Sequence, residues 1–172
     1  CDLLEGLKER GTTVPVLFRF RDLLRSRIAE LNDSFRKAIK EAGYQGKYQG
    51  VYPIKVNQQR QVVEEIAEFG TKYDYGLEAG SKPELIAAMA HMHNPNAYLI
   101  CNGYKDDEFI DLALTAQKMG LNIFIVLEMP SELDVIMERA RRMDIRPNLG
   151  VRVKLAAKGG GSENKSKMYM LN

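Results

Sequence analysis

The chain has 172 residues, of which 45% are hydrophobic and 28% are charged, so it carries enough apolar material for a sizeable globular core. Its formal net charge is only +2, which indicates neither a nucleic-acid partner nor an anionic membrane surface. No apolar run is long enough to span a bilayer, no signal-peptide pattern opens the chain, and Cys1 and Cys101 form no disulfide or metal framework. We therefore expect a cytoplasmic protein without nucleic-acid or membrane partners.

Short β-rich runs alternate with longer helical patterns along the chain. Strands are predicted at residues 15–20, 48–56, 73–78, 97–102, 122–128 and 149–155. Between them, apolar residues recur three and four positions apart, as on one face of a helix. Strand–helix units repeated in this way predict a parallel α/β sheet, and a doubly wound sheet and a (β/α) barrel both fit the pattern. No glycine-rich dinucleotide fingerprint follows any of these strands.

Local signals predict where several helices begin. Ser81 is followed three residues later by Glu84, which is the capping-box pattern, and acidic residues begin the helix after Asp106. Ser131 with Asp134 repeats the capping pattern less strongly.

The C-terminal part of the sequence predicts an unfinished fold. Residues 157–167 are rich in glycine, serine and lysine, which is typical of a mobile loop that could close over a site. A barrel would need three more strand–helix units after the last predicted strand. We therefore expect the chain to be a fragment of a longer protein.

Polar residues lie in, or directly after, the predicted apolar strands. They are Lys55, Glu78, Asn102, Glu128 and Arg152. The carboxyl ends of parallel strands meet at one edge of a sheet, where α/β proteins collect their chemistry. The pattern predicts a polar pocket at that edge, although some of these residues could instead be ion-paired packing residues.

Lys55 is the strongest candidate for a catalytic residue, because a lysine seldom lies in an apolar, β-branched run without a partner. An amine at a strand end fits either an aldolase-type Schiff base with substrate or a Schiff base with pyridoxal phosphate. Glu78 could pair with the amine or with a cofactor, and the guanidinium of Arg152 suits a phenolate, a carboxylate or a phosphate. His91 and His93 suggest a capping or surface role, and no metal site is indicated.

Three blocks carry a resemblance to a known family. They are VYPIKVNQ at residues 51–58, YDYGLEAGSKPEL at residues 73–85, and LGVRVKL at residues 149–155 with the SKM that follows. From about Val14 to its end, the chain resembles the biosynthetic arginine decarboxylases, which belong to the fold-type III, alanine-racemase-like group of pyridoxal phosphate enzymes. The family's next motif is usually Ser-Lys-Phe-Gly, whereas this chain has Ser-Lys-Met-Tyr at residues 166–169.

The resemblance implies roles for individual residues. Lys55 matches the lysine that forms the Schiff base with pyridoxal phosphate, and Glu78 matches an acidic residue close to the cofactor ring. Arg152 matches an arginine that reaches toward the phenolic oxygen of the cofactor. Glu84 matches the family's glutamate at the start of the following helix, and we place it with Asn102 and Glu128 around the substrate or behind the residues that touch the cofactor.

The resemblance also implies a fold and an activity. It predicts the first five strands of an incomplete (β/α)8 barrel at residues 21–172, preceded at residues 1–20 by the end of a separate β-domain with one strand. It implies decarboxylation of L-arginine to agmatine and CO2 in polyamine (spermidine) biosynthesis by a homo-oligomer, a dimer or tetramer, that uses Mg2+. The family's ring-stacking histidine, phosphate loop and acidic partner of the pyridine nitrogen are missing from this sequence, so the fragment alone should be inactive.

Three alternatives remain open from the sequence. One is a related decarboxylase acting on diaminopimelate, ornithine or carboxynorspermidine. Another is a non-catalytic homologue that binds pyridoxal phosphate and regulates a partner, although the retained Lys55 weighs against it. A Schiff-base aldolase is weaker, because the GLEAGSKPEL block is not an aldolase feature.

Overall fold

A computed structural model describes residues 2–154 and 166–171. The helices are α1 (Asp2–Glu9), α2 (Arg21–Glu41), α3 (Arg60–Gly70), α4 (Lys82–His91), α5 (Asp107–Lys118) and α6 (Ser131–Arg142), with short 3-10 turns η1 (Ile54–Val56) and η2 (Thr71–Tyr73). The strands are β1 (Val51–Pro53), β2 (Gly76–Ala79), β3 (Tyr98–Cys101), β4 (Asn122–Leu127), β5 (Leu149–Lys154) and β6 (Ser166–Leu171).

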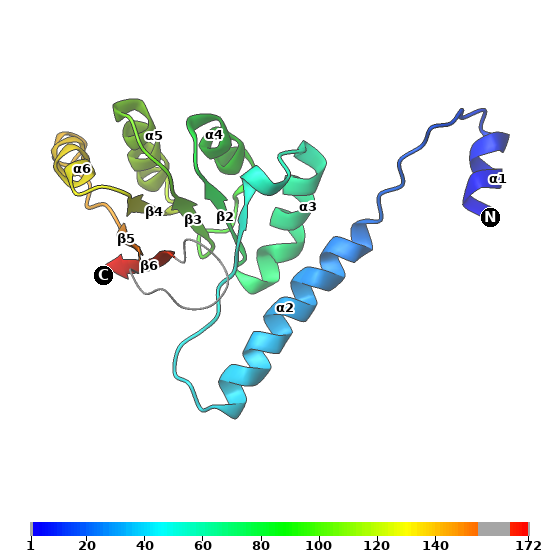
Figure 1. Ribbon diagram of the computed structural model, residues 1–172, viewed down its shortest axis with the longest axis horizontal. Coiled ribbons are helices and arrows are strands. Elements are labelled where there is room, and N and C mark those ends of the chain that lie inside the picture. Colours follow the sequence, from blue (N-terminus) through cyan, green and yellow to red (C-terminus); the bar gives the residue numbers. More distant parts are fainter. Residues whose placement is uncertain (1, 155–165, 172) are drawn as a thin grey trace.

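Five parallel strands form the centre of the molecule in the order β1-β2-β3-β4-β5, and β6 pairs antiparallel with β5. Helices α3 to α6 lie along one face of this sheet (Figure 1). Each helix follows a strand and returns the chain to the start of the next one, which is the arrangement of repeated βαβ units. The predicted parallel α/β architecture is therefore confirmed.

The two faces of the sheet carry different side chains. The main core lies between the sheet and the helices, and includes Leu77, Leu99, Ile123 and Ile125, all 0% exposed. Ile100, Phe124 and Val126 form a second apolar cluster with Val51 and Tyr98. Because successive residues of a strand point to opposite faces, this second cluster marks the face away from the helices.

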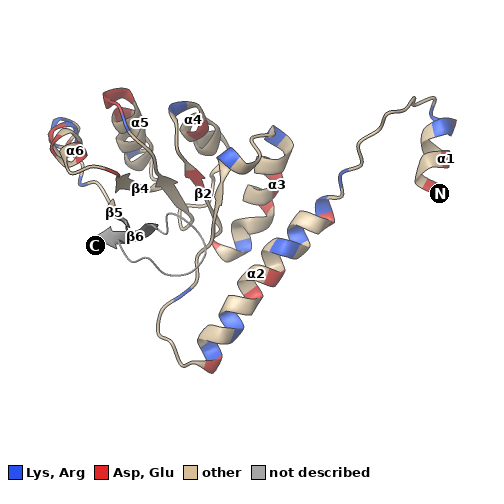
Figure 2. Ribbon diagram, viewed as in Figure 1, with Lys and Arg blue, Asp and Glu red and all other residues tan. Residues whose placement is uncertain are grey.

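Helix α2 precedes the sheet and packs beside α3 (Figure 1). Arg21 at its start pairs with Glu65 at 2.8 Å and with Glu68 at 3.0 Å, and its guanidinium lies over the ring of Phe69. Ile28 is the buried apolar residue of this helix. Acidic and basic residues alternate along much of its length (Figure 2), as on a mostly solvated helix.

The predicted strand at residues 15–20 does not form. These residues belong to no helix or strand, no described strand pairs with them, and Leu17 and Phe20 are 75% and 55% exposed. An apolar run becomes a strand only where a neighbouring strand accepts its backbone hydrogen bonds. The assignment of residues 1–20 to a separate β-domain stays a prediction.

The first and last strands also differ from the prediction. The strand predicted at residues 48–56 is limited to β1, because Pro53 has no N–H to donate and the chain then turns into η1. The predicted loop at residues 157–167 mostly lies outside the described residues, but its last two residues begin β6. Strand β6 pairs antiparallel with β5, with Leu149 opposite Leu171 and Lys154 opposite Ser166.

Candidate functional site

Four of the five polar residues predicted at strand ends share one face and one edge of the sheet. Asn102 and Glu128 each follow a residue of the second apolar cluster by two positions, Ile100 and Val126 respectively. Glu78 is in register with Ile100. Alternation along the strands therefore places these side chains at the carboxyl edge, on the face away from the helices.

Arg152 completes this group through a direct contact. Its Nε lies 3.2 Å from Oε1 of Glu128, and the two side chains are 31% and 13% exposed. The same carboxylate oxygen accepts a hydrogen bond from the backbone N–H of Gly103 at 3.0 Å. Gly103 has φ +81°, and a Cβ there would lie 2.8 Å from the carbonyl oxygen of Gly80, so this turn requires glycine. The site thus presents an oriented guanidinium at the end of β5.

Lys55 lies beside this group but not within a strand. It is the middle residue of η1, two positions after Pro53, which is in register with Glu78. Its side chain is exposed, whereas we expected an amine held in the apolar end of a strand. No ion pair to Lys55 occurs among the described residues. The chain therefore offers an accessible amine at the carboxyl edge of the sheet.

Glu84 stabilises the turn between β2 and α4. Its Oε2 accepts the backbone N–H of Gly80 at 2.7 Å, and Ser81 accepts the backbone N–H of Glu84 at 3.5 Å, so the predicted helix start is confirmed. Nε2 of Gln58, three residues after Lys55, lies 3.5 Å from Oε1 of Glu84. Glu84 thus joins the Lys55 turn to the end of β2, and none of its described contacts reaches Glu128 or Arg152.

Asn102 is buried, with 8% of its surface exposed. Its backbone N–H donates to the carbonyl oxygen of Ala79 at 2.9 Å, which extends the β2–β3 pairing by one residue. Its side-chain oxygen Oδ1 has no hydrogen-bond partner among the described residues. A buried polar atom without a partner is uncommon in folded proteins, and this one lies on the face that carries the other candidate residues.

Two residues that the sequence analysis did not predict, Lys105 and Glu132, lie at the turns that follow β3 and β4. The side chain of Lys105 is 0% exposed, and its Nζ lies 3.6 Å from Oε2 of Glu132, which is 5% exposed. Burial lowers the pKa of the Lys105 amine, while the neighbouring Glu132 and Glu128 carboxylates act in the opposite direction. Ser131, which we expected to cap α6, makes no side-chain cap; Glu132 instead accepts the backbone N–H of Glu128 at 2.8 Å.

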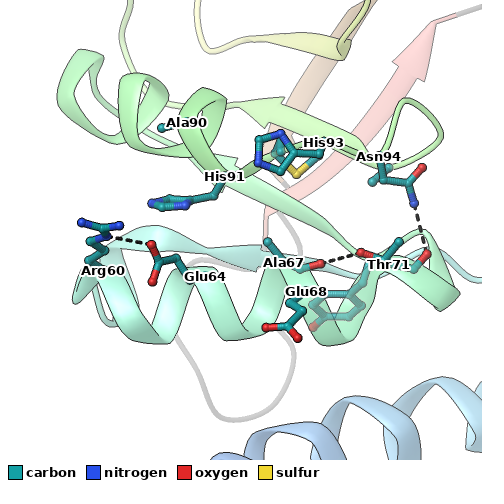
Figure 3. Close-up of a pocket in the computed structure, with 12 residues that line it drawn as sticks. Arg60, Glu64, Ala67, Glu68, Thr71, Ala90, His91, His93 and Asn94 are labelled. Atoms are coloured by element: carbon teal, nitrogen blue, oxygen red, sulfur yellow. Dashed lines mark hydrogen bonds and ion pairs between the residues drawn. The ribbon is translucent and has the colours of Figure 1, made fainter.

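Two cavities lie in different parts of the fold. One of about 460 Å³ lies at the carboxyl edge, where the β2–α4 and β3–α5 turns meet, and Gly80, Lys105 and Asp106 line it. A larger one of about 690 Å³ lies between α3 and α4, where Arg60 pairs with Glu64 and the His91 ring extends between the helices (Figure 3). Neither cavity is lined by any of the predicted site residues, so the candidate site is defined by the strand-end side chains and not by a cavity.

The described residues contain no group of three or more histidine, cysteine or acidic side chains that could hold a metal ion. None of the described helices has the length and apolar character to cross a bilayer. Cys101 is buried in the β3 strand, and burial raises the pKa of its thiol to about 12. The Cys101 thiol is therefore protonated and unreactive at neutral pH.

An exposed ion-pair cluster links the two turns at this edge. Nζ of Lys82 lies 2.7 Å from both Asp106 Oδ2 and Glu108 Oε2, so the start of α4 meets the start of α5 (Figure 2). These contacts raise the pKa of Lys82 to about 12. Asp106 also caps α5 by accepting the backbone N–H of Phe109 at 2.9 Å. The Lys82 ion pair and then this cap hold the pKa of Asp106 below its ordinary value of 3.8.

Asp106→Ser should lower the thermal midpoint of the full-length protein at pH 7, because serine keeps the helix cap and loses the ion pair. The folded-state pKa of Asp106 lies below 3.8, so the ion pair stabilises the protein above that pH and its contribution is lost as the pH falls further. The difference between variant and wild type should therefore narrow below pH 3.8. A difference that stays constant from pH 7 to pH 3 would show that the charge of Asp106 contributes nothing.

Comparisons with known proteins identify the family to which this chain is similar. The family described as "Pyridoxal-dependent decarboxylase, pyridoxal binding domain" matches residues 26–168. A biosynthetic arginine decarboxylase of Gloeobacter violaceus is 54% identical over 159 residues, which are 92% of this chain and 25% of that protein. Arginine decarboxylase 1 of Oryza sativa is 54% identical over 154 residues, which are 88% of this chain and 22% of that protein.

A solved structure extends the likeness to the fold. The biosynthetic arginine decarboxylase of Campylobacter jejuni superposes with a TM-score of 0.80 at 39% identity, over 87% of this chain and 25% of that one. The expected partial (β/α) barrel is confirmed. The chain spans about a quarter of the length of the relatives it matches. With most of its length inside the matching region, this chain belongs to the pyridoxal-dependent decarboxylases, as part of their pyridoxal-binding domain.

Proposed function

We propose that this chain is the N-terminal part of the cofactor-binding barrel of an arginine decarboxylase, an enzyme that converts L-arginine to agmatine and CO2 in polyamine biosynthesis. The observation that carries this proposal is the 54% identity to a biosynthetic arginine decarboxylase across 92% of the chain. The whole protein then contains further segments that complete the barrel and the active site. On this view, the residues described above bind and orient, while other segments supply the remaining contacts.

The residues at the carboxyl edge fit pyridoxal phosphate. An exposed lysine amine can bond covalently to its aldehyde, and the guanidinium of Arg152 can donate hydrogen bonds to an anionic oxygen. The unpartnered, buried Oδ1 of Asn102 can accept a hydrogen bond on the same face. When bound, the cofactor supplies an electron sink for the electrons of the breaking bond between Cα and the carboxylate.

We assign separate tasks to the protein's own groups. Lys55 Nζ would hold the cofactor, and as a free amine it would be able to carry a proton. Arg152, which contacts Glu128, would bind an anionic oxygen of the cofactor, and Glu78 would contribute a carboxylate to the same site. Glu84 acts indirectly, because it fixes the turn after β2 and contacts the segment that follows Lys55. These roles stay predictions for the full-length protein.

We also expect properties that belong to the whole protein. By resemblance, it is a cytoplasmic homo-oligomer, a dimer or tetramer, that acts on L-arginine and binds neither nucleic acid nor membranes. The Mg2+ expected from the resemblance has no ligand cluster among the described residues, so any magnesium site would use other parts of the whole protein. Sedimentation of the full-length enzyme with and without Mg2+ measures its oligomeric state and whether that state depends on the metal.

Borohydride trapping tests the proposed cofactor site. The full-length protein is incubated with pyridoxal phosphate, reduced, digested and mapped by mass spectrometry. We expect a pyridoxyl group on Lys55 and none on the buried Lys105, which serves as an internal control. Release of CO2 from L-arginine, compared with ornithine, diaminopimelate and carboxynorspermidine, then identifies the substrate. Absence of the Lys55 adduct in folded protein with excess cofactor would overturn the proposal, and an adduct without CO2 release from any substrate would indicate a non-catalytic binding protein.

A further inference from the structure

We propose that Lys105 and Glu132 form a buried positioning pair that holds the Glu128–Arg152 contact in place at the cofactor edge of the sheet. The inference rests on the proposed function, because that function gives Arg152 its role. No described contact joins either residue to Arg152: both act through the backbone turns that follow β3 and β4. They are positioning residues rather than catalytic ones.

The Lys105 amine joins the ends of two neighbouring strands. It donates hydrogen bonds to the carbonyl oxygens of Gly103, just after β3, and of Val126, in β4. Its third contact is Glu132 Oε2 at 3.6 Å, and the lysine side chain is 0% exposed. The ammonium group thus makes two hydrogen bonds to backbone carbonyl oxygens, and its charge is paired with the Glu132 carboxylate. The amine therefore fixes the spacing of the two turns.

The Glu132 carboxylate performs the complementary task. Oε1 accepts the backbone N–H of Lys105 at 3.2 Å, and Oε2 accepts the backbone N–H of Glu128 at 2.8 Å. One carboxylate at the start of α6 thus binds the turn after β3 and the turn after β4. Charge-assisted hydrogen bonds of this kind are stronger than those between neutral groups.

These contacts close into a ring that ends on the site. The Lys105 amine donates to the carbonyl oxygen of Gly103, and the backbone N–H of Gly103 donates to Glu128 Oε1 at 3.0 Å. The backbone N–H of Glu128 in turn donates to Glu132, and the Glu132 carboxylate pairs with the Lys105 amine. Arg152 binds the same Oε1 of Glu128 at 3.2 Å. A shift of either turn would therefore move the carboxylate that orients the Arg152 guanidinium.

Burial of this pair argues for a role beyond stability. Taking two charges out of water is costly, and an apolar pair of similar volume is often as stable or more stable. A second ion-pair cluster joins α5 to α6 at a more exposed position: Arg139 of α6 pairs with Asp111 and, at 2.6 Å, with Asp107 of α5. The fold thus has an exposed link between α5 and α6 and a separate, buried link between the turn after β3 and α6.

A double-mutant cycle on cofactor binding tests the proposal. The affinity of full-length apo protein for pyridoxal phosphate is measured by absorbance titration for Lys105→Met, Arg152→Met and the double variant. We expect Lys105→Met to weaken binding roughly tenfold in the wild-type background and less than about twofold in the Arg152→Met background, because residues that act through one contact are not additive. Glu132→Gln, which keeps one carbonyl acceptor, should show the same pattern with a smaller effect and is the variant to use if Lys105→Met does not fold.

Arg139→Met is the matched control, since it breaks the exposed ion pairs between α5 and α6 and leaves the Lys105–Glu132 pair intact. It should lower the thermal midpoint while leaving cofactor affinity within about twofold in both backgrounds. Equal losses from Lys105→Met or Glu132→Gln with and without Arg152 would overturn the proposal, as would an Arg152→Met variant that binds the cofactor normally. Either result can occur while Lys55 is still labelled and arginine is still decarboxylated, so failure of this inference is distinguishable from failure of the proposed function.

Discussion

Replacing Lys55 by alanine in the full-length protein is expected to lower kcat for arginine decarboxylation by roughly 1,000-fold or more. Lys55 is the exposed amine at the carboxyl edge of the sheet, two residues after Pro53, which is in register with Glu78. If Lys55 has the role proposed above, the variant lacks the covalent bond to the cofactor and a group able to carry a proton. Steady-state release of CO2 from L-arginine measures the effect, and the cofactor absorbance band reports the lost attachment.

Two variants test whether the reaction needs the Lys55 amine itself, and not only a positive charge or any exposed lysine. Lys55→Arg keeps the positive charge but lacks a nucleophilic amine, so it should be as inactive as Lys55→Ala. Lys47→Ala removes another exposed lysine, near the opposite end of β1, and should change kcat less than about twofold. A small primary amine added to Lys55→Ala should restore part of the activity. Near-normal kcat in Lys55→Ala would contradict the role proposed for this residue.

The sheet and its polar edge could be read from the sequence because both depend on local pattern. The runs at β3 and β4 are apolar at nearly every position, as expected for strands covered on both faces. Asn102 and Glu128 directly follow these strands, and Arg152 lies two residues after a glycine that pairs with Val126. Parallel order then brings their side chains together without any further information.

Other features depend on contacts that a strand pattern does not contain. Residues 15–20 have strand composition, but strand formation needs a neighbour to pair with, and no described strand provides one. Lys55 was expected within a strand, whereas the preceding Pro53 ends the ladder and the chain turns into η1. Both errors arise because composition reports a preference and the hydrogen-bonding partners decide the outcome.

The Lys105–Glu132 pair shows a different limit. An acidic residue in the first turn of a helix is ordinarily explained by the helix dipole, and a lysine after a strand by a solvated loop. The signal available was that Glu132 comes four residues after Glu128, close enough to reach back across the turn between β4 and α6. Only the structure shows that Lys105 is buried against it. Long-range pairs of this kind require knowledge of which turns are adjacent.

Gly76 controls how closely β2 and β3 approach. It is buried in β2, directly in register with β3, since the adjoining residues Leu77 and Leu99 are paired. A Cβ at this position would lie 1.9 Å from the carbonyl oxygen of Tyr98 and 2.9 Å from its carbonyl carbon. Both are backbone atoms, which cannot rotate away as a flexible side chain can. Any larger residue must therefore push β3 aside, and Glu78 lies two residues further along the same strand.

Gly76→Ala should destabilise the protein by about 3 kcal/mol, at the upper end of the usual cost of overpacking a core. Displacement of β2 should also shift Glu78 and weaken cofactor binding, so the variant should lose both stability and affinity. The shift of the urea midpoint and an absorbance titration with pyridoxal phosphate measure the two effects. Gly6→Ala is the matched control: its Cβ would meet only Arg10 Nη2 at 3.7 Å within helix α1, so stability should stay the same or rise slightly. An unchanged midpoint in Gly76→Ala would show that β2 and β3 can separate at that point without cost.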